Sequence, residues 1–312
     1  MTRVGAIDCG TNSIRLLIAD VVDGRVFDLH REMRIVRLGQ GVDATGEFAP
    51  EALARTRAAL GDYTALLNRY QVPQLRMVAT SATRDVGNTA EFFAMTSEVL
   101  AAAVPGAVAE VITGEEEAAL SFHGVVDELD SAAAPFLVTD LGGGSTELVF
   151  GTGDVEASYS ADIGCVRLTE RHLHSDPPTA TEVAAAREVT RERLGDALRE
   201  VPVEQARTWV GVAGTMTTLS ALAQNMTTYD SVAIHLSRVR FPELLDVCDQ
   251  LIGMTRAQRA VLGPMHEGRV DVIAGGAIIV EELADALRQR AGISELIVSE
   301  HDILDGIALS IA

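Results

Sequence analysis

The chain has 312 residues, 47% of them hydrophobic, and a formal net charge of -20. This length favours about two domains, and this apolar content is ample for packed cores and too high for a disordered chain. The negative charge argues against sequence-independent binding of nucleic acid and against docking on anionic membranes. All 25 basic residues are arginines, which excludes every mechanism that needs a lysine.

The cysteines and the N-terminus indicate the compartment. Cys9, Cys165 and Cys248 are scattered and lack CxxC spacing, which argues against a disulfide framework or a structural zinc site and fits a reducing compartment. The opening MTRVGAIDCG has the pattern of a strand and a turn rather than of a signal peptide. No apolar run approaches the ~18 residues of a membrane span. We therefore expect a soluble cytoplasmic protein without a membrane partner.

In the N-terminal part of the chain, strand patterns come first and helices follow. Residues 3–41 contain successive apolar runs, interrupted at CGTNS and at Asp23-Gly24, a strong hairpin signal. A turn at Gly114 opens a helix whose first turn carries Glu115 to Glu117, where the helix dipole favours negative charge. Between these segments we expect a helix at 50–70, a strand at 75–80, a helix at 89–103 and a strand at 109–113.

The small-residue segment DSAAAP (130–135) is the best candidate for a domain boundary. It gives domains 1–130 and 131–312, with the C-terminal helix able to pack back onto the first. Strands alternate with helices on both sides of it, which indicates an α/β architecture with layered sheets. The later elements are expected to be strands at 136–141, 146–151 and 154–161, a helix from about 181 to 201, a strand, glycine turn and helix over 208–223, helices at 241–252 and 271–290, a strand at 295–300, and a last helix.

One long-range echo links the two halves. The segments VGAIDCGTNSIRLLIAD (4–20) and FLVTDLGGGSTELVFG (136–151) share one form: an apolar strand, an aspartate, an apolar residue, a glycine, a small polar turn and a second apolar strand. Three positions match in order: Asp8 with Asp140, Gly10 with Gly142, and Ser13 with Ser145. Each half therefore begins with the same unit.

The glycine turns are candidates for phosphate binding, but two well-known phosphate motifs do not fit them. A P-loop needs a lysine after its glycines, and the chain has none. A dinucleotide fingerprint needs a third glycine that opens a helix, whereas TELVFG alternates like a strand. There remains a β-hairpin whose tight turn offers N–H donors to phosphate. The alternative is a pair of ordinary hairpins, which leaves the matching aspartates unexplained.

These motifs together resemble the exopolyphosphatase and guanosine pentaphosphate phosphohydrolase family, within the sugar kinase/Hsp70/actin superfamily. The resemblance is carried, in family order and over the whole chain, by AIDCGTNSIRLLIAD, ATSATRD, ITGEEEAALSFHG, VTDLGGGSTELVFG, DIGCVRLTE and GVAGTMTTL. It implies an α/β fold of two ribonuclease-H-like (actin-like ATPase) domains, with mixed sheets flanked by helices and the active site in the interdomain cleft. The length matches the short, two-domain members of the family.

The resemblance also implies a divalent cofactor, Mg²⁺ or Mn²⁺. Asp140 is then the principal metal carboxylate, and Glu147 and Asp8 act beside it, in part through water. Mg²⁺ prefers one or two carboxylates together with substrate oxygens and water, which fits hydrolysis of a phosphoanhydride. The alternative interpretation is that Asp140 only stabilises its turn.

The resemblance selects Glu117 as the catalytic general base toward the attacking water. Three carboxylates at one helix start repel each other, and partial burial would raise the pKa of one of them toward the working pH. Glu115 and Glu116 equally fit a role as helix-start charges. Arg84, which closes TSATR, is expected to contact substrate phosphate, a bidentate task that suits a guanidinium; a surface salt bridge is its alternative.

The remaining candidate residues would contact the substrate. Arg167 and the pair Gly214-Thr215 are candidates for a substrate channel, with a surface position and a packing turn as the respective alternatives. The seven histidines show no ligand spacing and are assigned no metal. Phosphate would be bound by N–H and hydroxyl groups of the two turns, which comprise Thr11, Asn12, Ser13, Gly142, Gly143, Gly144 and Ser145.

Together these expectations describe a metal-dependent exopolyphosphatase that releases orthophosphate from the ends of inorganic polyphosphate. Asp302 and Leu304 stand where family members often carry a glycine and an arginine, and this departure predicts a preference for short chains. The closest alternative is a guanosine pentaphosphate 5′-phosphohydrolase of the stringent response, with (p)ppGpp as partner. An ATP-dependent kinase and a non-enzymatic alarmone sensor are more distant alternatives. The family favours a homodimer.

Overall fold

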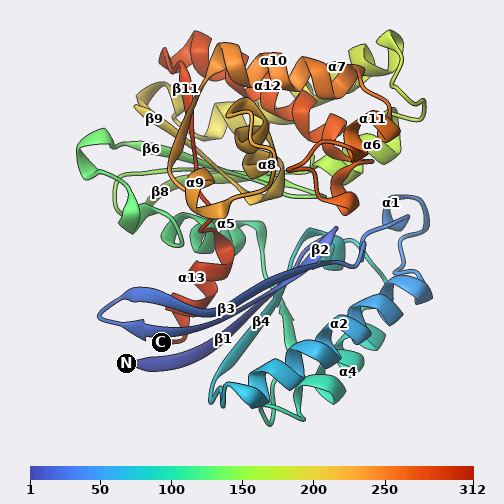
Figure 1. The fold of residues 1–312 in the computed structure, drawn as a ribbon, viewed down its shortest axis with the longest axis vertical. Coiled ribbons are helices and arrows are strands. Elements are labelled where there is room, and N and C mark those ends of the chain that lie inside the picture. The colour runs from blue at the N-terminus through green and yellow to red at the C-terminus, as the bar shows by residue number, and fades with distance from the viewer. The chain divides into compact units, whose positions relative to one another are not determined.

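The computed structural model describes all residues, Met1–Ala312, and the chain forms two compact units (Figure 1). Unit 1 comprises Met1–Val125 together with Ile303–Ala312, and unit 2 comprises Val126–Asp302. The expected division between residues 130 and 131 lies shortly after the one between Val125 and Val126. The last helix, α13 (Ile303–Ser310), returns to the strands of unit 1 and is drawn in red beside them. No helix combines the length and the apolar character that crossing a bilayer requires.

Unit 1 is built on a five-stranded mixed sheet with the order β3-β2-β1-β4-β5. β1, β2 and β3 pair antiparallel, whereas β4 lies parallel to β1, and β5 parallel to β4. Asp23 and Gly24 both adopt positive φ in the hairpin between β2 and β3, as their sequence predicts. The strands are β1 (Thr2–Cys9), β2 (Ser13–Val22), β3 (Arg25–Ile35), β4 (Leu75–Ala79) and β5 (Ala109–Val111).

Helices cover both faces of this sheet because consecutive residues of its central strand β2 are apolar and point to opposite faces. On β2, Leu16 and Ile18 belong to one core cluster, and Leu17 and Ala19 to another. The first cluster also takes residues from α2 and α4, and the second takes residues from α5 and α13. The helices of unit 1 other than α13 are α1 (Val42–Thr45), α2 (Pro50–Arg69), α3 (Ser81–Arg84), α4 (Thr89–Leu100) and α5 (Gly114–His123).

Unit 2 contains a six-stranded mixed sheet with the order β10-β11-β9-β6-β7-β8. β6, β7 and β8 pair antiparallel, β9 lies parallel to β6 and β11 parallel to β9, and β10 adds an antiparallel edge. The strands are β6 (Phe136–Leu141), β7 (Thr146–Gly151), β8 (Val155–Ala161), β9 (Thr208–Val212), β10 (Ser237–Arg240) and β11 (Glu295–Val298).

The helices of unit 2 pack around α12, most of whose residues are buried. α12 contacts α6, α7, α8 and α10. A capping box between Thr179 and Glu182 starts α7. The indole of Trp209 is fully buried, donates to Thr139 Oγ1 at 3.0 Å and meets the Phe241 ring edge-on. The helices are α6 (Cys165–His172), α7 (Ala180–Glu200), α8 (Ala213–Ala223), α9 (Ser231–Ile234), α10 (Phe241–Gly253), α11 (Arg256–Ala260) and α12 (Ile273–Ala291).

The two sheets are structural copies of one another. Without β10, the order β8-β7-β6-β9-β11 repeats the order β3-β2-β1-β4-β5, with the same parallel and antiparallel pairings. Even the irregularity recurs: the strand register shifts between Ile18 and Ala19 in unit 1 and between Phe150 and Gly151 in unit 2. The predicted fold of two mixed sheets flanked by helices is confirmed.

The sequence analysis missed α6, β10 and the shortest helices. α6 begins after Gly164, which offers no capping side chain, and no proline marks its first turn. β10 has only four residues, Ser237–Arg240, and exists because it adds to the edge of β11. Both elements depend on tertiary pairing rather than on a local signal.

Candidate active site

In unit 1 the predicted site residues lie at the carboxyl ends of the parallel strands. These ends are joined by backbone hydrogen bonds: the Thr80 N–H donates to the Cys9 carbonyl, and the Ile112 N–H donates to the Ala79 carbonyl, both at 3.2 Å. The glycine turn follows β1, α3 follows β4, and α5 follows β5. Ligands of α/β sheets commonly bind at this end of the strands.

The turn of unit 1 is a tight hairpin whose carbonyl groups accept hydrogen bonds from the segment that follows β3. The Gly10 N–H donates to the Ser13 carbonyl at 2.9 Å. The Asn12 carbonyl accepts from two N–H groups, those of Val36 and Arg37, and the Thr11 carbonyl accepts from Gly39. Gly39 packs closely against this turn, because an added Cβ would lie 2.3 Å from the Thr11 side-chain methyl, Cγ2. The carbonyl groups of residues 11 and 12 are therefore engaged behind the turn.

Asp8 forms a buried ion pair across the hairpin. Asp8 and Arg15 are cross-strand partners in β1 and β2, and Arg15 donates to Asp8 Oδ2 from Nε at 2.9 Å and from Nη2 at 2.6 Å. Asp8 itself is buried, and Arg15 is largely covered. The charge of this carboxylate is therefore compensated within unit 1.

Arg84 and Glu117, predicted for neighbouring roles, are in direct contact. Arg84 Nη1 donates to Glu117 Oε2 at 2.9 Å and to the Ile112 carbonyl at 3.0 Å. Glu117 is only 8% exposed, while the Arg84 side chain keeps 25% of its surface exposed. The contact therefore places a buried carboxylate beside a half-exposed guanidinium.

At the start of α5, only Glu117 of the three consecutive glutamates is buried. Thr113 caps the helix, accepting from the Glu116 N–H at its hydroxyl and from the Glu117 N–H at its carbonyl. Glu115 and Glu116 face solvent, and Glu116 pairs with Arg76. This matches the expectation that Glu115 and Glu116 are helix-start charges.

In unit 2 the equivalent hairpin brings two carboxylates together. Asp140 on β6 and Glu147 on β7 are direct cross-strand partners, and both are buried. Ser160, the partner of Glu147 on β8, donates its hydroxyl to Glu147 Oε1 at 2.7 Å. Like charges directly opposite each other destabilise a sheet, so a cation at this position would relieve the repulsion. The donors are all oxygens, the type that Mg²⁺ prefers.

The glycine turn of unit 2 repeats that of unit 1 and is backed by α6. The Gly142 N–H donates to the Ser145 carbonyl at 3.0 Å. The N–H groups at the start of α6 donate to the carbonyls of Gly142 and Gly143. An added Cβ on Gly164 would lie 2.4 Å from the Gly143 backbone, so the close packing of helix and turn requires a glycine there.

Arg167 lies next to this turn. Its N–H donates to the Gly143 carbonyl at 3.0 Å, and its half-buried guanidinium stands 3.7 Å from Asp162. The side chain is thus neither a freely exposed surface arginine nor a core residue.

Gly214 and Thr215 open α8 and are packed by an arginine that the sequence analysis did not select. Arg269 Nη1 donates to the Gly214 carbonyl at 2.8 Å and to Thr218 Oγ1 at 3.0 Å. An added Cβ on Gly214 would lie 2.0 Å from Arg269 Nη2, and Thr215 is buried. This geometry explains Gly214 as a packing turn.

The two C-terminal positions that depart from the family pattern are both buried. Leu304 is 1% exposed and belongs to the core formed with α5 and α13, and Asp302 is 3% exposed. Leu304 therefore packs in the hydrophobic core of unit 1.

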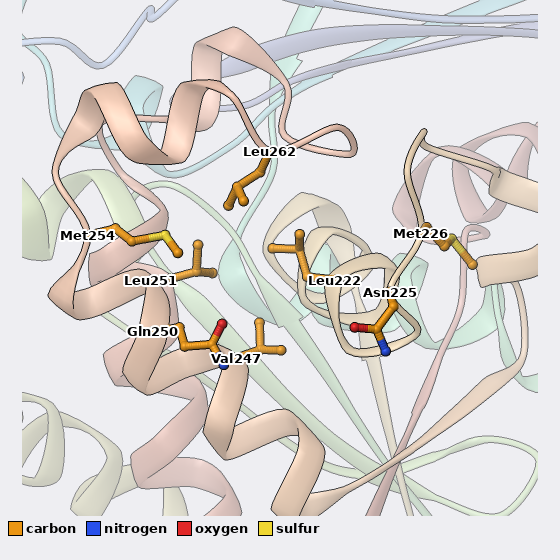
Figure 2. A pocket seen from close by; sticks show the side chains of 8 residues that line it. All are labelled: Leu222, Asn225, Met226, Val247, Gln250, Leu251, Met254 and Leu262. Atoms are coloured by element: carbon orange, nitrogen blue, oxygen red, sulfur yellow. The ribbon is translucent and has the colours of Figure 1, made fainter.

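One open cavity of about 280 Å³ lies between α8 and α10 in unit 2, and none of the predicted site residues lines it (Figure 2). Its wall is mostly aliphatic side chains and methionines, with two amides, a composition that offers no charge to a polyanion. The lining residues are Leu222, Asn225, Met226, Val247, Gln250, Leu251, Met254 and Leu262.

Sequence reasoning missed three residues that contact the predicted site: Arg15, Ser160 and Arg269. A signal for Arg15 existed, because counting outward from the Gly10–Ser13 turn in a hairpin pairs Asp8 with position 15. The same count from Gly142–Ser145 pairs Asp140 with Glu147. Arg269 gave no such signal, since it reaches Gly214 only through the tertiary fold.

The repeated sheet order, with matching glycine turns at equivalent strand ends, places the chain in the ribonuclease-H-like, actin-like ATPase fold class. Residues 17–311 match the Ppx/GppA phosphatase family. The chain belongs to this family of hydrolases.

Individual relatives agree with this assignment. A protein of Mycobacterium tuberculosis (strain ATCC 25618 / H37Rv) named Exopolyphosphatase 2 is 71% identical over 316 residues, which covers 100% of this chain and 99% of that protein. A solved structure described as an exopolyphosphatase-like protein is 41% identical, with a TM-score of 0.95 over 99% of this chain and 98% of that one. The Ppx/GppA family member of Aquifex aeolicus is 31% identical, with a TM-score of 0.81 over 99% of this chain and 97% of that one.

Proposed function

We propose that this chain is an exopolyphosphatase that hydrolyses the terminal phosphoanhydride of inorganic polyphosphate and releases orthophosphate. The observation that carries the proposal is the contact between buried Glu117 and half-exposed Arg84 at 2.9 Å. This contact places Glu117, the candidate general base, beside the Arg84 guanidinium, which is suited to binding phosphate. The name of the relative at 71% identity supports polyphosphate as the substrate.

In the proposed reaction, Arg84 binds oxygens of the terminal phosphoryl group, and Glu117 accepts a proton from the attacking water. The water oxygen forms a bond to the terminal phosphorus as the bond from phosphorus to the bridging oxygen breaks in line. The products are orthophosphate and a polyphosphate shortened by one unit. General base catalysis of this kind contributes roughly 10²–10⁴-fold.

The glycine turns would bind the rest of the chain end. N–H and hydroxyl groups of Thr11, Asn12 and Ser13 in one turn, and of residues 142–145 in the other, are of the type that binds phosphate oxygens. Arg167 would add a positive charge beside the second turn.

Asp140 and Glu147 would hold a divalent cation, Mg²⁺ or Mn²⁺. Such an ion supplies neutralisation of phosphate charge when bound. The fit rests on the two buried carboxylates that face each other across β6 and β7. Asp8 would have a smaller role, because Arg15 already compensates its charge.

Phosphate release from tripolyphosphate, long polyphosphate and guanosine pentaphosphate, measured side by side, tests the substrate. We expect release from polyphosphate in the presence of Mg²⁺, faster on short chains, and loss of release in excess chelator. Release from guanosine pentaphosphate alone would replace this proposal by the alarmone phosphohydrolase. Rates that rise steadily toward long chains would refute the short-chain preference only.

A further inference from the structure

Glu128, His235 and His301 form a cluster in unit 2 that the sequence analysis did not foresee. One ligand-type atom from each of the three side chains lies within 4.8 Å of the other two. Glu128 ends the 3₁₀ turn Val126–Glu128, His235 follows α9, and His301 lies between β11 and α13. The histidines were assigned no metal because they lack ligand spacing along the chain. The fold brings two of them together.

The carboxylate is the centre of this cluster. Glu128 Oε2 accepts from His301 Nδ1 at 2.7 Å and lies 3.1 Å from His235 Nε2. The two imidazole centroids are 4.5 Å apart, with their planes inclined by 39°. Hydrogen bonds from both imidazoles hold the pKa of Glu128 well below its usual range. Two imidazole nitrogens and one carboxylate oxygen thus lie close together, and Glu128 supplies the negative charge of the cluster.

The backbone around the two histidines is fixed locally. Asp230 caps α9 by accepting from the N–H groups of Val232 and Ala233, which sets the position at which His235 leaves the helix. The Ser299 hydroxyl accepts from the His301 N–H at 3.0 Å and donates to its carbonyl at 2.9 Å. The backbone positions of both histidines are therefore set by local hydrogen bonds.

We infer that Glu128, His235 and His301 bind a divalent transition metal of the zinc class. Two imidazoles and one carboxylate are a ligand set that suits Zn²⁺, which takes nitrogen ligands readily, unlike Mg²⁺. Zinc bonds of about 2.1 Å in a tetrahedron place ligand atoms roughly 3.4 Å apart. The separations of 2.7 and 3.1 Å around Glu128 need only a small spreading to reach this value.

Three protein ligands leave the fourth tetrahedral position for water. The side chains of Glu128, His235 and His301 keep 42%, 24% and 27% of their surface exposed. Water can therefore complete the coordination, and the ion can enter from solvent.

One contact must give way when the metal binds. The Glu300 N–H donates to His235 Nδ1 at 3.3 Å, so the proton of the neutral ring resides on Nε2. When the metal binds His235 through Nε2, the ring proton moves to Nδ1. It then points at the Glu300 N–H, and the hydrogen bond between them is lost. At 3.3 Å this hydrogen bond is long and weak, so the metal displaces it without losing a strong interaction.

The metal would fasten the two ends of unit 2. Glu128 lies near the first residue of that unit, Val126, and His301 directly precedes its last, Asp302. The ion would tie both ends to the segment that follows α9. None of its ligands is among the proposed catalytic residues, so this site is separate in chemistry and in composition from the carboxylates of the β6–β7 hairpin.

Zinc titration of the untagged, full-length protein against a chromophoric zinc chelator tests this inference directly. Millimolar Mg²⁺ is added so that the oxygen-only carboxylates are saturated. The three cysteines are buried and should not compete. We expect about one Zn²⁺ per chain, a higher thermal midpoint with zinc, and a visible absorption band typical of tetrahedral coordination when Co²⁺ replaces Zn²⁺.

Glu128→Gln, which keeps the hydrogen-bond acceptor, and His301→Gln should each weaken Zn²⁺ binding by at least about tenfold and abolish the Co²⁺ band. His174→Gln, at an exposed histidine outside the cluster, is the matched control and should bind like the wild type. Circular dichroism establishes that each variant is folded. The inference is overturned if the wild type binds no Zn²⁺ in the micromolar range. It is equally overturned if folded Glu128→Gln and His301→Gln proteins keep full stoichiometry.

Discussion

The β1–β2 and β6–β7 hairpins have the same backbone and opposite electrostatics. Each closes with a glycine N–H donating to a serine carbonyl, at 2.9 Å in one and 3.0 Å in the other. Each carries an aspartate at the same place, but its cross-strand partner is Arg15 for Asp8 and Glu147 for Asp140. The same structural unit thus yields a compensated aspartate in unit 1 and a carboxylate pair in unit 2. One position on the second strand, Arg15 or Glu147, therefore makes the electrostatic difference between the two hairpins.

Among the comparisons of the two hairpins, the largest expected effect distinguishes the two aspartates. Asp140→Asn removes a proposed ligand of the cation and should lower the rate of phosphate release by roughly 10²–10³-fold. Raised Mg²⁺ should partly restore that rate. Asp8→Asn should lower the rate less and leave the Mg²⁺ dependence nearly unchanged. Steady-state assays over a range of Mg²⁺ concentrations measure both, and equal shifts in Mg²⁺ dependence would contradict the assignment of the cation to unit 2.

A second experiment compares the stability of the two cross-strand pairs without added metal. Arg15→Met leaves the buried Asp8 carboxylate without its guanidinium and should lower the free energy of unfolding by about 3 kcal/mol. Glu147→Gln removes a like-charge neighbour of Asp140 and should raise it by up to about 1 kcal/mol. Urea denaturation gives both values.

Arg3→Met is the control for the first of these changes. Arg3 pairs with Asp20 across the same two strands, at 2.9 Å, but is a third exposed, so its loss should lower the free energy of unfolding much less than the loss of Arg15 does. Equal losses for Arg15→Met and Arg3→Met would show that the Asp8 pair is an ordinary surface contact.

The glycines that back the two turns provide a third comparison. An added Cβ on Gly164 meets the Gly143 backbone, whereas one on Gly39 meets a side-chain methyl of Thr11. A methyl group can move and a buried backbone cannot, so Gly164→Ala should be the more harmful, by about 1–3 kcal/mol in stability. It should also raise the KM for polyphosphate. A larger effect of Gly39→Ala on either quantity would contradict this view of the turns.

The last comparison is between the two hairpins and Glu281, a carboxylate far from both of them in sequence, and it concerns the dependence of stability on pH. Burial raises the pKa of Glu281 to about 7, although the Arg187 guanidinium at 2.7 Å opposes the rise. Because the folded pKa lies above the unfolded value of 4.5, this group stabilises the fold below about pH 4.5. As the pH rises from about 4.5 to 7, this contribution is lost, and the free energy of unfolding falls by about 1–2 kcal/mol once solvent screening is allowed for. Glu281→Gln should flatten this part of the pH–stability profile, and an unchanged profile would exclude Glu281 as its source.

Much of the fold was accessible from the sequence because its signals are local. Asp23-Gly24 marks a hairpin, alternation marks β2, and the matching turns at Gly10 and Gly142 mark the duplication. The burial of Glu117, and not of Glu115 or Glu116, fits helix periodicity, because Glu117 lies three and four residues before the buried Leu120 and Ser121. These inferences need only neighbours along the chain.

The remaining contacts could not be predicted because they join distant segments. Arg84 reaches Glu117 only because β4 and β5 are adjacent in the sheet. Arg269 covers Gly214 across 55 residues, and His301 meets Glu128 across 173. Sequence spacing carries no information about such pairs, and this is why the histidine cluster was missed.

The most direct test of the account is the turnover of Glu117→Gln compared with that of Glu115→Gln on polyphosphate. The two residues share the first turn of α5, but one is buried beside Arg84 and the other is exposed. We predict that Glu117→Gln still binds polyphosphate and releases orthophosphate roughly 10²–10⁴-fold more slowly, while Glu115→Gln behaves like the wild type. Undiminished turnover by a folded Glu117→Gln protein would contradict the proposal that this carboxylate activates the water.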